Sequence, residues 1–278
     1  MQLTGAARLA GVMGWPVKHS RSPRLHGFWI EKYGIDGAYV PLAVRPDDLP
    51  AALRALRTLG FAGTNLTVPH KELALGVLDH VDPLVRRIGA ANTIVVRNDG
   101  SLEGSNTDAF GFIENVRTGA PDWTADAPAV VVGAGGAARA VIVGLLDEGV
   151  RTVRIVNRTY ERAARLAEEF GATALEWGQW RAALDGAGLL VNTTTQGMDG
   201  EPPLDIDLTA LPTRAVVNDI VYVPLETPLL AAARRRGNRV VDGLGMLLHQ
   251  ARPGFRAWFG VDPEVTPELR AHVAVGLG

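Results

Sequence analysis

A run of apolar residues that ends in a glycine-rich turn constrains the fold of this chain more than any other feature. Ala129–Val132 is continuously apolar, as central parallel strands are, and the sequence continues GAGGAARA over residues 133–140. Gly133, Gly135 and Ala138 fit the pattern G-x-G-x-x-(G/A). In this pattern the first glycine permits a tight turn, the second lets the backbone approach a pyrophosphate, and the third residue lets the helix pack closely on the strand.

The helix that follows such a turn presents N–H groups and a partial positive charge at its amino terminus, and both favour phosphate groups. The sequence therefore predicts a dinucleotide-binding strand, turn and helix. A tight strand–helix turn without a ligand is the alternative, because glycine serves tight turns of every kind.

The end of the next predicted strand indicates which dinucleotide is bound. In such a unit an acidic residue about 20 residues further on holds the ribose 2′-hydroxyl of NAD. Here the strand Val153–Val156 is followed by Asn157, Arg158 and Thr159, with Arg162 one helical turn later and no acid at the tip. Two guanidinium groups suit a 2′-phosphate, so we expect NADP rather than NAD. An assignment in which Thr159 caps the helix and Arg162 faces solvent is compatible with this one.

Apolar, β-rich runs alternate with helical patterns over most of the chain, which predicts an α/β architecture with mainly parallel strands. The expected strands cover residues 9–17, 37–44, 63–68, 92–97, 102–104, 129–132, 153–157, 189–192 and 215–220. The expected helices cover residues 23–33, 46–59, segments after Lys71, from about Asp108 and after the glycine turn, and residues 160–170, 244–259 and 267–275. Asn98-Asp99-Gly100 predicts a hairpin turn, and the Pro-, Asp-, Ala- and Gly-rich segment 119–128 is expected to be a domain boundary.

Composition excludes several classes of function. The 28 basic and 30 acidic residues give a formal net charge of −2, whereas a protein that binds nucleic acid needs a basic face. The chain has no cysteine, which excludes disulfides, thiolate-bound metals and thiol catalysis. The six histidines lack metal-ligand spacing, and the apolar stretch 127–146 contains four glycines and Arg139, so neither a metal site nor a membrane span is expected. The amino terminus shows no secretion signal, and we expect a cytoplasmic protein.

Two hydroxyl groups lie directly before the first predicted helix. Ser20 and Ser22 precede Pro23, and these residue types favour Ser22 as the helix N-cap and Pro23 as the first helical residue. That assignment leaves Ser20 unexplained. A pair of hydroxyls beside helix N–H groups is also a receptor for a carboxylate, so both interpretations stand.

Lys71 is one of only three lysines in the chain, and it follows the polar segment 63–70. An ordinary exposed lysine in a first helical turn is one interpretation, although a cation there opposes the helix dipole. Asp108 stands before another apolar helix and suits an N-cap. If Lys71 and Asp108 meet, they form a proton-transfer pair. Carbonyl reduction requires such a group, because the oxygen gains a proton as the carbon gains a hydride.

Nine short strings, in order along the chain, carry a resemblance to known proteins. They are the G-x-P-x-x-H-S-x-S-P run at 14–23, the G-x-N-L-T-x-P-x-K run at 63–71, GAANT at 89–93, NTD at 106–108, GAGGAARA at 133–140, NRT at 157–159, NTTTQGM at 192–198, DIVY at 219–222 with TP at 227–228, and DGLGMLLHQ at 242–250. In these strings the chain resembles the shikimate dehydrogenase family, the NADP-dependent enzymes of aromatic amino-acid biosynthesis, over essentially its whole length.

The resemblance implies reversible reduction of 3-dehydroshikimate to shikimate by NADPH. It assigns Ser20 and Ser22 to the substrate carboxylate, and it makes Lys71 the acid/base, with Asp108 orienting the substrate and Lys71. The residues that it places around the ring hydroxyls are Thr67, Asn92, Asp108, Tyr222 and Gln250. The residues that it places around the cofactor are Gly133, Ala134, Gly135, Gly136 and Ala137 for the phosphates, Asn157, Arg158, Thr159 and Arg162 for the 2′-phosphate, and Ile220 and Gly243 for the nicotinamide.

The resemblance also implies two domains. An amino-terminal α/β substrate domain would cover residues 1–108 and be completed by residues 244–278, whose helices pack back on it. A Rossmann-like, doubly wound NADP-binding domain would cover residues 109–243. The family contains both monomers and homodimers, so the oligomeric state stays open.

Two rival functions share part of this pattern. Quinate or dual quinate/shikimate dehydrogenases often replace the second serine of the S-x-S pair by threonine and carry an acid at the end of the second nucleotide-binding strand. Ser22 and Arg158 both argue against that rival. A non-catalytic, NADPH-binding regulatory module would have lost the proton-transfer pair, yet Lys71 and Asp108 are both present.

Overall fold

The computed structural model describes residues 3–277, and the chain divides into two compact units. One unit is formed by the chain up to Thr107 together with Gln250–Ala274. The other is formed by Asp108–His249 with the carboxyl-terminal residues from Val275. The chain therefore enters the second unit at Asp108. The domain boundary expected at residues 119–128 is wrong, because that segment lies within the second unit.

The first unit contains a six-stranded mixed sheet with the order β2-β1-β3-β5-β6-β4. Its strands are β1 (Arg8–Gly14), β2 (Gly37–Ala43), β3 (Phe61–Leu66), β4 (His80–Val81), β5 (Thr93–Val96) and β6 (Leu102–Ser105). β1 is parallel to β2 and β3, whereas β5 is antiparallel to both of its neighbours, β3 and β6. The carboxyl ends of β1, β2, β3 and β6 therefore share one edge with the amino end of β5, and most loops that carry predicted site residues of this unit start there.

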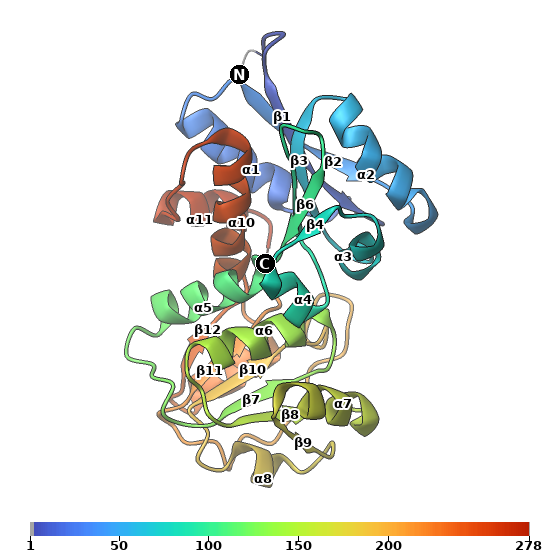
Figure 1. Ribbon diagram of the computed structural model, residues 1–278. Coiled ribbons are helices and arrows are strands. Elements are labelled where there is room, and N and C mark those ends of the chain that lie inside the picture. The colour runs from blue at the N-terminus through green and yellow to red at the C-terminus, as the bar shows by residue number, and fades with distance from the viewer. Residues whose placement is uncertain (1–2, 278) are drawn as a thin grey trace. The chain divides into compact units, whose positions relative to one another are not determined.

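Helices cover both faces of this sheet (Figure 1). They are α1 (Ser22–Lys32), η1 (Pro46–Asp48), α2 (Leu49–Thr58), α3 (His70–Leu73), η2 (Ala74–Gly76), α4 (Pro83–Ile88), α11 (Pro267–Ala274) and the part of α10 (Leu244–Phe259) that follows His249. On one face the leucines of α2 pack with Met13 and Leu66. On the other face Trp29 of α1 packs against Phe255 of α10.

The carboxyl-terminal helices complete the first unit, as the resemblance predicts. Trp258 of α10 is buried, and its Nε1 donates a hydrogen bond to the carbonyl oxygen of Ile94 at 2.9 Å. Trp29 Nε1 donates to the carbonyl oxygen of Glu264 at 3.0 Å, which fixes the segment before α11 on α1. Both indole N–H groups are thus satisfied by backbone that lies more than a hundred residues away in sequence.

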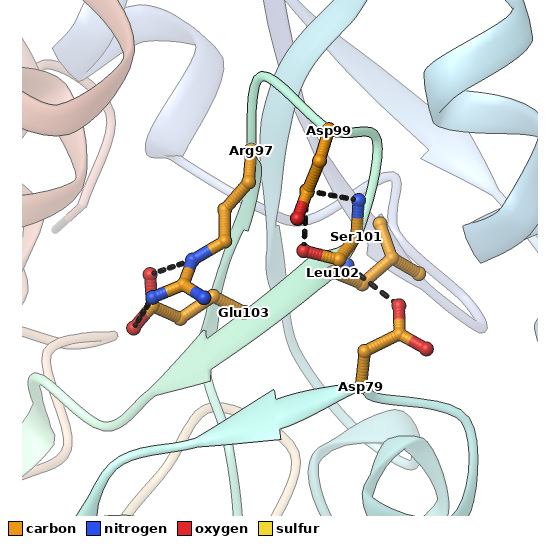
Figure 2. A network of polar contacts seen from close by, with 6 residues as sticks. All are labelled: Asp79, Arg97, Asp99, Ser101, Leu102 and Glu103. Carbon is orange, nitrogen blue, oxygen red and sulfur yellow. Dashed lines mark hydrogen bonds and ion pairs between the residues drawn. The ribbon is translucent and has the colours of Figure 1, made fainter.

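The predicted hairpin is confirmed, because β5 and β6 pair antiparallel around Asn98-Asp99-Gly100. Asp99 Oδ1 accepts hydrogen bonds from the Ser101 backbone N–H at 2.9 Å and from the Ser101 hydroxyl at 2.7 Å. Arg97 and Glu103 form an ion pair of 3.0 Å across the two strands, and the Asp79 carboxylate accepts from the first N–H of β6 at 2.8 Å (Figure 2). The side chains at the turn therefore fix both strands in register.

The second unit contains a six-stranded sheet that is parallel throughout, with the order β12-β11-β10-β7-β8-β9. Its strands are β7 (Ala129–Val132), β8 (Val153–Val156), β9 (Thr173–Leu175), β10 (Leu189–Asn192), β11 (Val216–Asp219) and β12 (Arg239–Val241). This is the doubly wound order of Rossmann-like folds, in which ligands bind where the strand order reverses. Here the reversal lies between β7 and β10, directly beside the glycine turn.

Helices cover both faces of the second sheet as well (Figure 1). They are α5 (Asp108–Gly119), α6 (Gly136–Asp147), α7 (Tyr160–Phe170), α8 (Trp180–Leu184) and α9 (Pro228–Arg235). Residues of α5, α6 and α7 form one hydrophobic core against the sheet, and residues of α8 and α9 form the other. α5 packs on α6 where a Cβ at Gly144 would lie 3.2 Å from Ile113, which explains why α5 belongs to this unit.

The sequence does not predict several short elements. They are β4, α4, β9, α8, α9 and β12, each of eight residues or fewer. The predicted strand 9–17 is too long, because β1 ends at Gly14 before the Trp15-Pro16 pair. Sequence periodicity needs a longer window than these elements offer.

Candidate active site

The glycine turn of the second unit has the geometry that a bound dinucleotide needs. Gly133 adopts φ +113°, and a Cβ there would lie 2.6 Å from Thr193 Oγ1. α6 begins at Gly136 after an extended Gly135, where a Cβ would meet no atom within 4 Å. The backbone at the start of α6 is therefore open to a ligand, and the first N–H groups of a helix have no acceptor within it. A pyrophosphate requires both features, a tight turn at the first glycine and a backbone that it can approach at the second.

Two arginines follow β8, which is the parallel neighbour of β7. Arg158 and Arg162 are exposed, and among residues 3–277 neither forms an ion pair. Thr159 is the N-cap residue of α7, but its side chain makes no capping hydrogen bond, whereas its carbonyl oxygen accepts from Asn157 Nδ2 at 2.8 Å. The two guanidinium groups therefore carry positive charge that no acid of the described chain neutralises. A site for a 2′-phosphate needs such charge.

The loops after β10 and β11 are joined by buried polar side chains. Asn192 Nδ2 donates to Asp219 Oδ1 at 3.0 Å, and the Val221 N–H donates to the same oxygen at 3.1 Å. Asp219 Oδ2 accepts from the Thr227 hydroxyl at 2.7 Å. Burial raises the pKa of Asp219 to about 6, although these three hydrogen bonds act in the opposite direction. Asp219 thus holds the loop that carries Ile220 and Tyr222.

This raised pKa predicts a pH-dependent stability. Asp219 is protonated in both states below about pH 4, and from there to about pH 6 only the folded protein keeps the proton. The free energy of unfolding should therefore fall by roughly 2–3 kcal/mol between these pH values and stay lower above them. In Asp219→Asn, which keeps one acceptor oxygen but does not titrate, this fall should be absent when urea unfolding is measured from pH 4.5 to pH 7. Asp207→Asn, at an exposed acid, is the matched control, and equal pH dependence in wild type and Asp219→Asn would contradict the assignment.

Gly243 lies directly against the loop that follows β11. A Cβ at Gly243 would lie 2.2 Å from the Ile220 carbonyl oxygen, so only glycine fits there. The structure therefore brings together the two residues that the resemblance assigns to the nicotinamide. Tyr222 is half-buried two residues further along the same loop.

Helix α1 of the first unit begins differently from the prediction. Ser22 is its first residue, and Arg21 precedes it as an N-cap residue without a side-chain cap. The prediction that Ser22 caps the helix is wrong, because Arg21 already has helical dihedral angles and the helix starts one residue earlier than expected. Instead the Ser20 hydroxyl oxygen accepts from the Ser22 backbone N–H at 3.3 Å. The Ser20 hydroxyl therefore lies at the backbone of Ser22, and the Ser22 hydroxyl takes no part in capping.

Thr67 and Lys71 lie on the segment after β3 that runs into α3, and backbone hydrogen bonds fix this segment at both residues. The Thr67 N–H donates to the Met13 carbonyl oxygen at 2.9 Å, and the Lys71 carbonyl oxygen accepts from the Ala91 N–H at 2.9 Å. Lys71 lies in a first helical turn, as one interpretation of the sequence has it, because α3, His70–Leu73, begins one residue before Lys71 and not after it. Lys71 is half-buried there and not exposed. The backbone of Lys71 is thus fixed beside the residue before Asn92.

The structure brings Asn92 and Gln250 together. Asn92 Nδ2 donates to Gln250 Oε1 at 3.4 Å and to Thr107 Oγ1 at 3.0 Å, while the Thr107 N–H donates to Asn92 Oδ1 at 2.9 Å. Asn92 precedes β5, Thr107 follows β6, and Gln250 lies on α10. Three segments that are distant in sequence therefore meet at the edge of the first sheet where β3 ends.

Two residues of this cluster are missing from the set that the sequence predicts. Asn65 Nδ2 donates to the Asn92 carbonyl oxygen and to Thr93 Oγ1, both at 3.1 Å, and Thr93 Oγ1 donates to Asn92 Oδ1 at 3.0 Å. Asn65 is a buried polar residue of β3. Such a residue must find partners on folding, and this signal could have identified it.

Asp108 begins α5 and is the first residue of the second unit, so its carboxylate lies in the first helical turn, where the helix dipole favours an acid. Its pairing with Lys71 stays a prediction. Within residues 3–277 no group of three or more His, Asp or Glu side chains could hold a metal ion. No helix in this range is long and apolar enough to cross a membrane.

Comparisons with known proteins bear on both units. Residues 12–94 match the family described as shikimate dehydrogenase substrate binding domain, residues 118–197 match shikimate / quinate 5-dehydrogenase, and residues 243–267 match the shikimate 5′-dehydrogenase C-terminal domain. The shikimate dehydrogenase (NADP(+)) of Paramagnetospirillum magneticum is 62% identical over 274 residues, which are 98% of this chain and 99% of that relative.

Solved structures are similar over nearly the whole chain. Shikimate 5-dehydrogenase from Thermus thermophilus, in complex with NADP(H) and shikimate, has a TM-score of 0.87 at 39% identity and covers 97% of this chain and 99% of its own. Quinate dehydrogenase from Corynebacterium glutamicum, in complex with NAD, has a TM-score of 0.89 at 32% identity and covers 96% of this chain and 98% of its own.

The parallel sheet, its strand order and the glycine turn define a two-unit α/β protein with a Rossmann-like nucleotide-binding fold. With 62% identity to a curated relative over almost its entire length, the chain belongs to the shikimate dehydrogenase family.

Proposed function

We propose that the protein catalyses the reversible, NADPH-dependent reduction of 3-dehydroshikimate to shikimate in aromatic amino-acid biosynthesis. Membership of the family supports this proposal, and so does one observation on this chain. Lys71 is fixed by its backbone beside Asn92, and Asn92 in turn bonds Gln250. The proposed acid/base and two proposed substrate contacts are thus held by one unit.

In this proposal the first unit binds the substrate and the second unit binds the cofactor. Ser20 and Ser22 donate hydrogen bonds to the substrate carboxylate, and the ring hydroxyls contact Thr67, Asn92, Asp108, Tyr222 and Gln250. The turn from Gly133 to Ala137, in which Gly135 is exposed, fits the phosphates, and Arg158 and Arg162, with Asn157 and Thr159, fit the 2′-phosphate.

The chemistry needs one hydride and one proton. NADPH, when bound, supplies the hydride to the carbonyl carbon. The Lys71 ammonium donates a proton to the carbonyl oxygen as negative charge develops there, and in the reverse direction Lys71 takes the proton from the hydroxyl. Asp108 holds the substrate and the Lys71 ammonium in the orientation for this transfer, and Ile220 and Gly243 place the nicotinamide.

Two features favour shikimate and NADP over quinate and NAD. Ser22 keeps the S-x-S pair, and Arg158 stands where an acid would hold the 2′-hydroxyl of NAD. We further propose a cytoplasmic enzyme of a small-molecule substrate that binds no nucleic acid and acts as a monomer or homodimer.

Initial rates with NADP⁺ and NAD⁺, each with shikimate and with quinate, test the proposal. We expect turnover confined largely to shikimate with NADP⁺. Turnover with quinate or NAD⁺ would overturn the specificity and leave the Lys71 chemistry intact. Absence of turnover with all four pairs would favour the non-catalytic binding module.

A further inference from the structure

A tyrosine that makes no proposed contact with substrate lies at the start of the buried polar network around Asn92. Tyr39 lies on β2, and its side chain is buried. Its hydroxyl donates to Asn65 Oδ1 at 2.6 Å, the shortest of the bonds that join these buried residues. Burial raises the pKa of Tyr39 well above its ordinary value, so the phenol keeps its proton and remains a donor.

The direction of this hydrogen bond is fixed by the backbone. Asn65 Nδ2 faces the Asn92 carbonyl oxygen at 3.1 Å, and a carbonyl oxygen can only accept. The Asn65 amide therefore cannot turn round, so its oxygen faces Tyr39 and the phenol has to donate.

The same direction continues from Asn65 to the residues proposed to bind substrate. Asn65 donates to Thr93 Oγ1, and the Thr93 hydroxyl in turn donates its own proton to Asn92 Oδ1 at 3.0 Å. Asn92 Oδ1 also accepts from the Thr107 N–H, which leaves the amide nitrogen of Asn92 directed at Gln250 Oε1. One proton of Tyr39 thus begins a chain of buried bonds that ends on α10.

The ring of Tyr39 is held in place without its hydroxyl. It stacks on the His26 ring, with 3.9 Å between the ring centroids and 7° between the planes. The centroid of the Trp258 ring lies 6.0 Å from that of Tyr39, in a tilted arrangement. His26 is fully buried, which lowers its pKa to about 3, so the stack consists of two neutral rings. Removal of the hydroxyl alone should therefore leave the phenyl ring where it is.

We propose that Tyr39 is a positioning residue of the substrate site, whose hydroxyl holds Asn65 and through it fixes Asn92 and Gln250. This inference rests on the proposed function. In the absence of the Tyr39 hydroxyl, Asn65 Oδ1 loses its donor in a buried place, and the Asn92 backbone and side chain lose a fixed support.

Tyr39→Phe tests this inference by steady-state kinetics. We expect the KM for shikimate to rise about five- to tenfold, the equivalent of one buried hydrogen bond, with kcat within about threefold and the KM for NADP⁺ unchanged. A purely structural role would lower the melting temperature and the active fraction but leave both KM values alone. Tyr33→Phe is the matched control, because the Tyr33 hydroxyl accepts from the Glu264 N–H at 3.2 Å outside this network.

A double-mutant cycle with Gln250→Ala tests the route. If Tyr39 acts through Asn92 on Gln250, the combined variant should raise the KM for shikimate by less than the product of the two single effects. A rise in KM equal to the product of the two single effects would overturn the route. An unchanged or lower KM in Tyr39→Phe, beside an active wild type, would overturn the inference alone, whereas a wild type without shikimate turnover would overturn the proposed function and the inference with it.

Discussion

Lys71→Ala is expected to lower kcat for shikimate oxidation by about 10²- to 10⁴-fold, the range that general acid–base catalysis contributes. Lys71 lies in α3, and its carbonyl oxygen accepts a hydrogen bond from the Ala91 N–H, so the backbone should stay in place when the side chain is removed. The KM for NADP⁺ should change little, because the proposed cofactor residues lie in the other unit. Initial rates at saturating shikimate and NADP⁺ measure the effect.

Lys32→Ala is the control for this variant. Lys32 lies in the last turn of α1, with its ammonium 5.7 Å from the centre of the Tyr33 ring, and takes no part in the proposed chemistry. Its kcat should match that of the wild type. A kcat of Lys71→Ala within about threefold of the wild type, in a protein that melts normally, would rule out Lys71 as the acid/base.

Arg158→Asp is expected to raise the KM for NADP⁺ by about 10²-fold, since a charge-assisted hydrogen bond is lost and a like charge faces the 2′-phosphate. NAD⁺ has a hydroxyl at this position, so its KM should change by less than about threefold or fall. The ratio of kcat/KM for the two cofactors measures the effect directly.

Arg165→Asp provides a matched control for Arg158→Asp. Arg165 is an exposed arginine on α7, and the same change of charge there should leave the cofactor ratio unaltered. Equal losses for NADP⁺ and NAD⁺ in Arg158→Asp would show that Arg158 serves the turn as a whole and not the 2′-phosphate.

Local features of the sequence predicted local structure well. The apolar strand, glycine turn and helix at 129–147 lie within one contiguous segment, and the hairpin at Asn98-Asp99-Gly100 depends on three adjacent residues. Both signals come from neighbours in sequence, which is why both predictions were correct. The start of α1 was wrong by one residue, because the dihedral angles of Arg21 and not the residue type of Ser22 decide where the helix begins.

Long-range polar contacts could not be predicted from the sequence. Tyr39 and Asn65 are 26 residues apart, and Asn92 and Gln250 are 158 apart, so no pattern of spacing relates them. The resemblance named Asn92 and Gln250 as individual site residues, whereas Asn65, Thr93 and their donor Tyr39 emerged only when the strands were placed side by side. Short edge strands such as β9 and β12 were missed for a related reason, since pairing in the sheet and not periodicity defines them.

The first unit is assembled from the two ends of the chain, and this has a consequence for its biosynthesis. The ribosome releases the strands of this unit first, but Trp258 and Phe255, which cover His26 and Tyr39, emerge only after Asp108–His249 has been made. At ~5–20 residues per second that interval lasts roughly 7–30 s. During this time the second unit, which is almost entirely one continuous segment, can already fold. The nascent first unit meanwhile exposes an aromatic surface that chaperones are suited to shield.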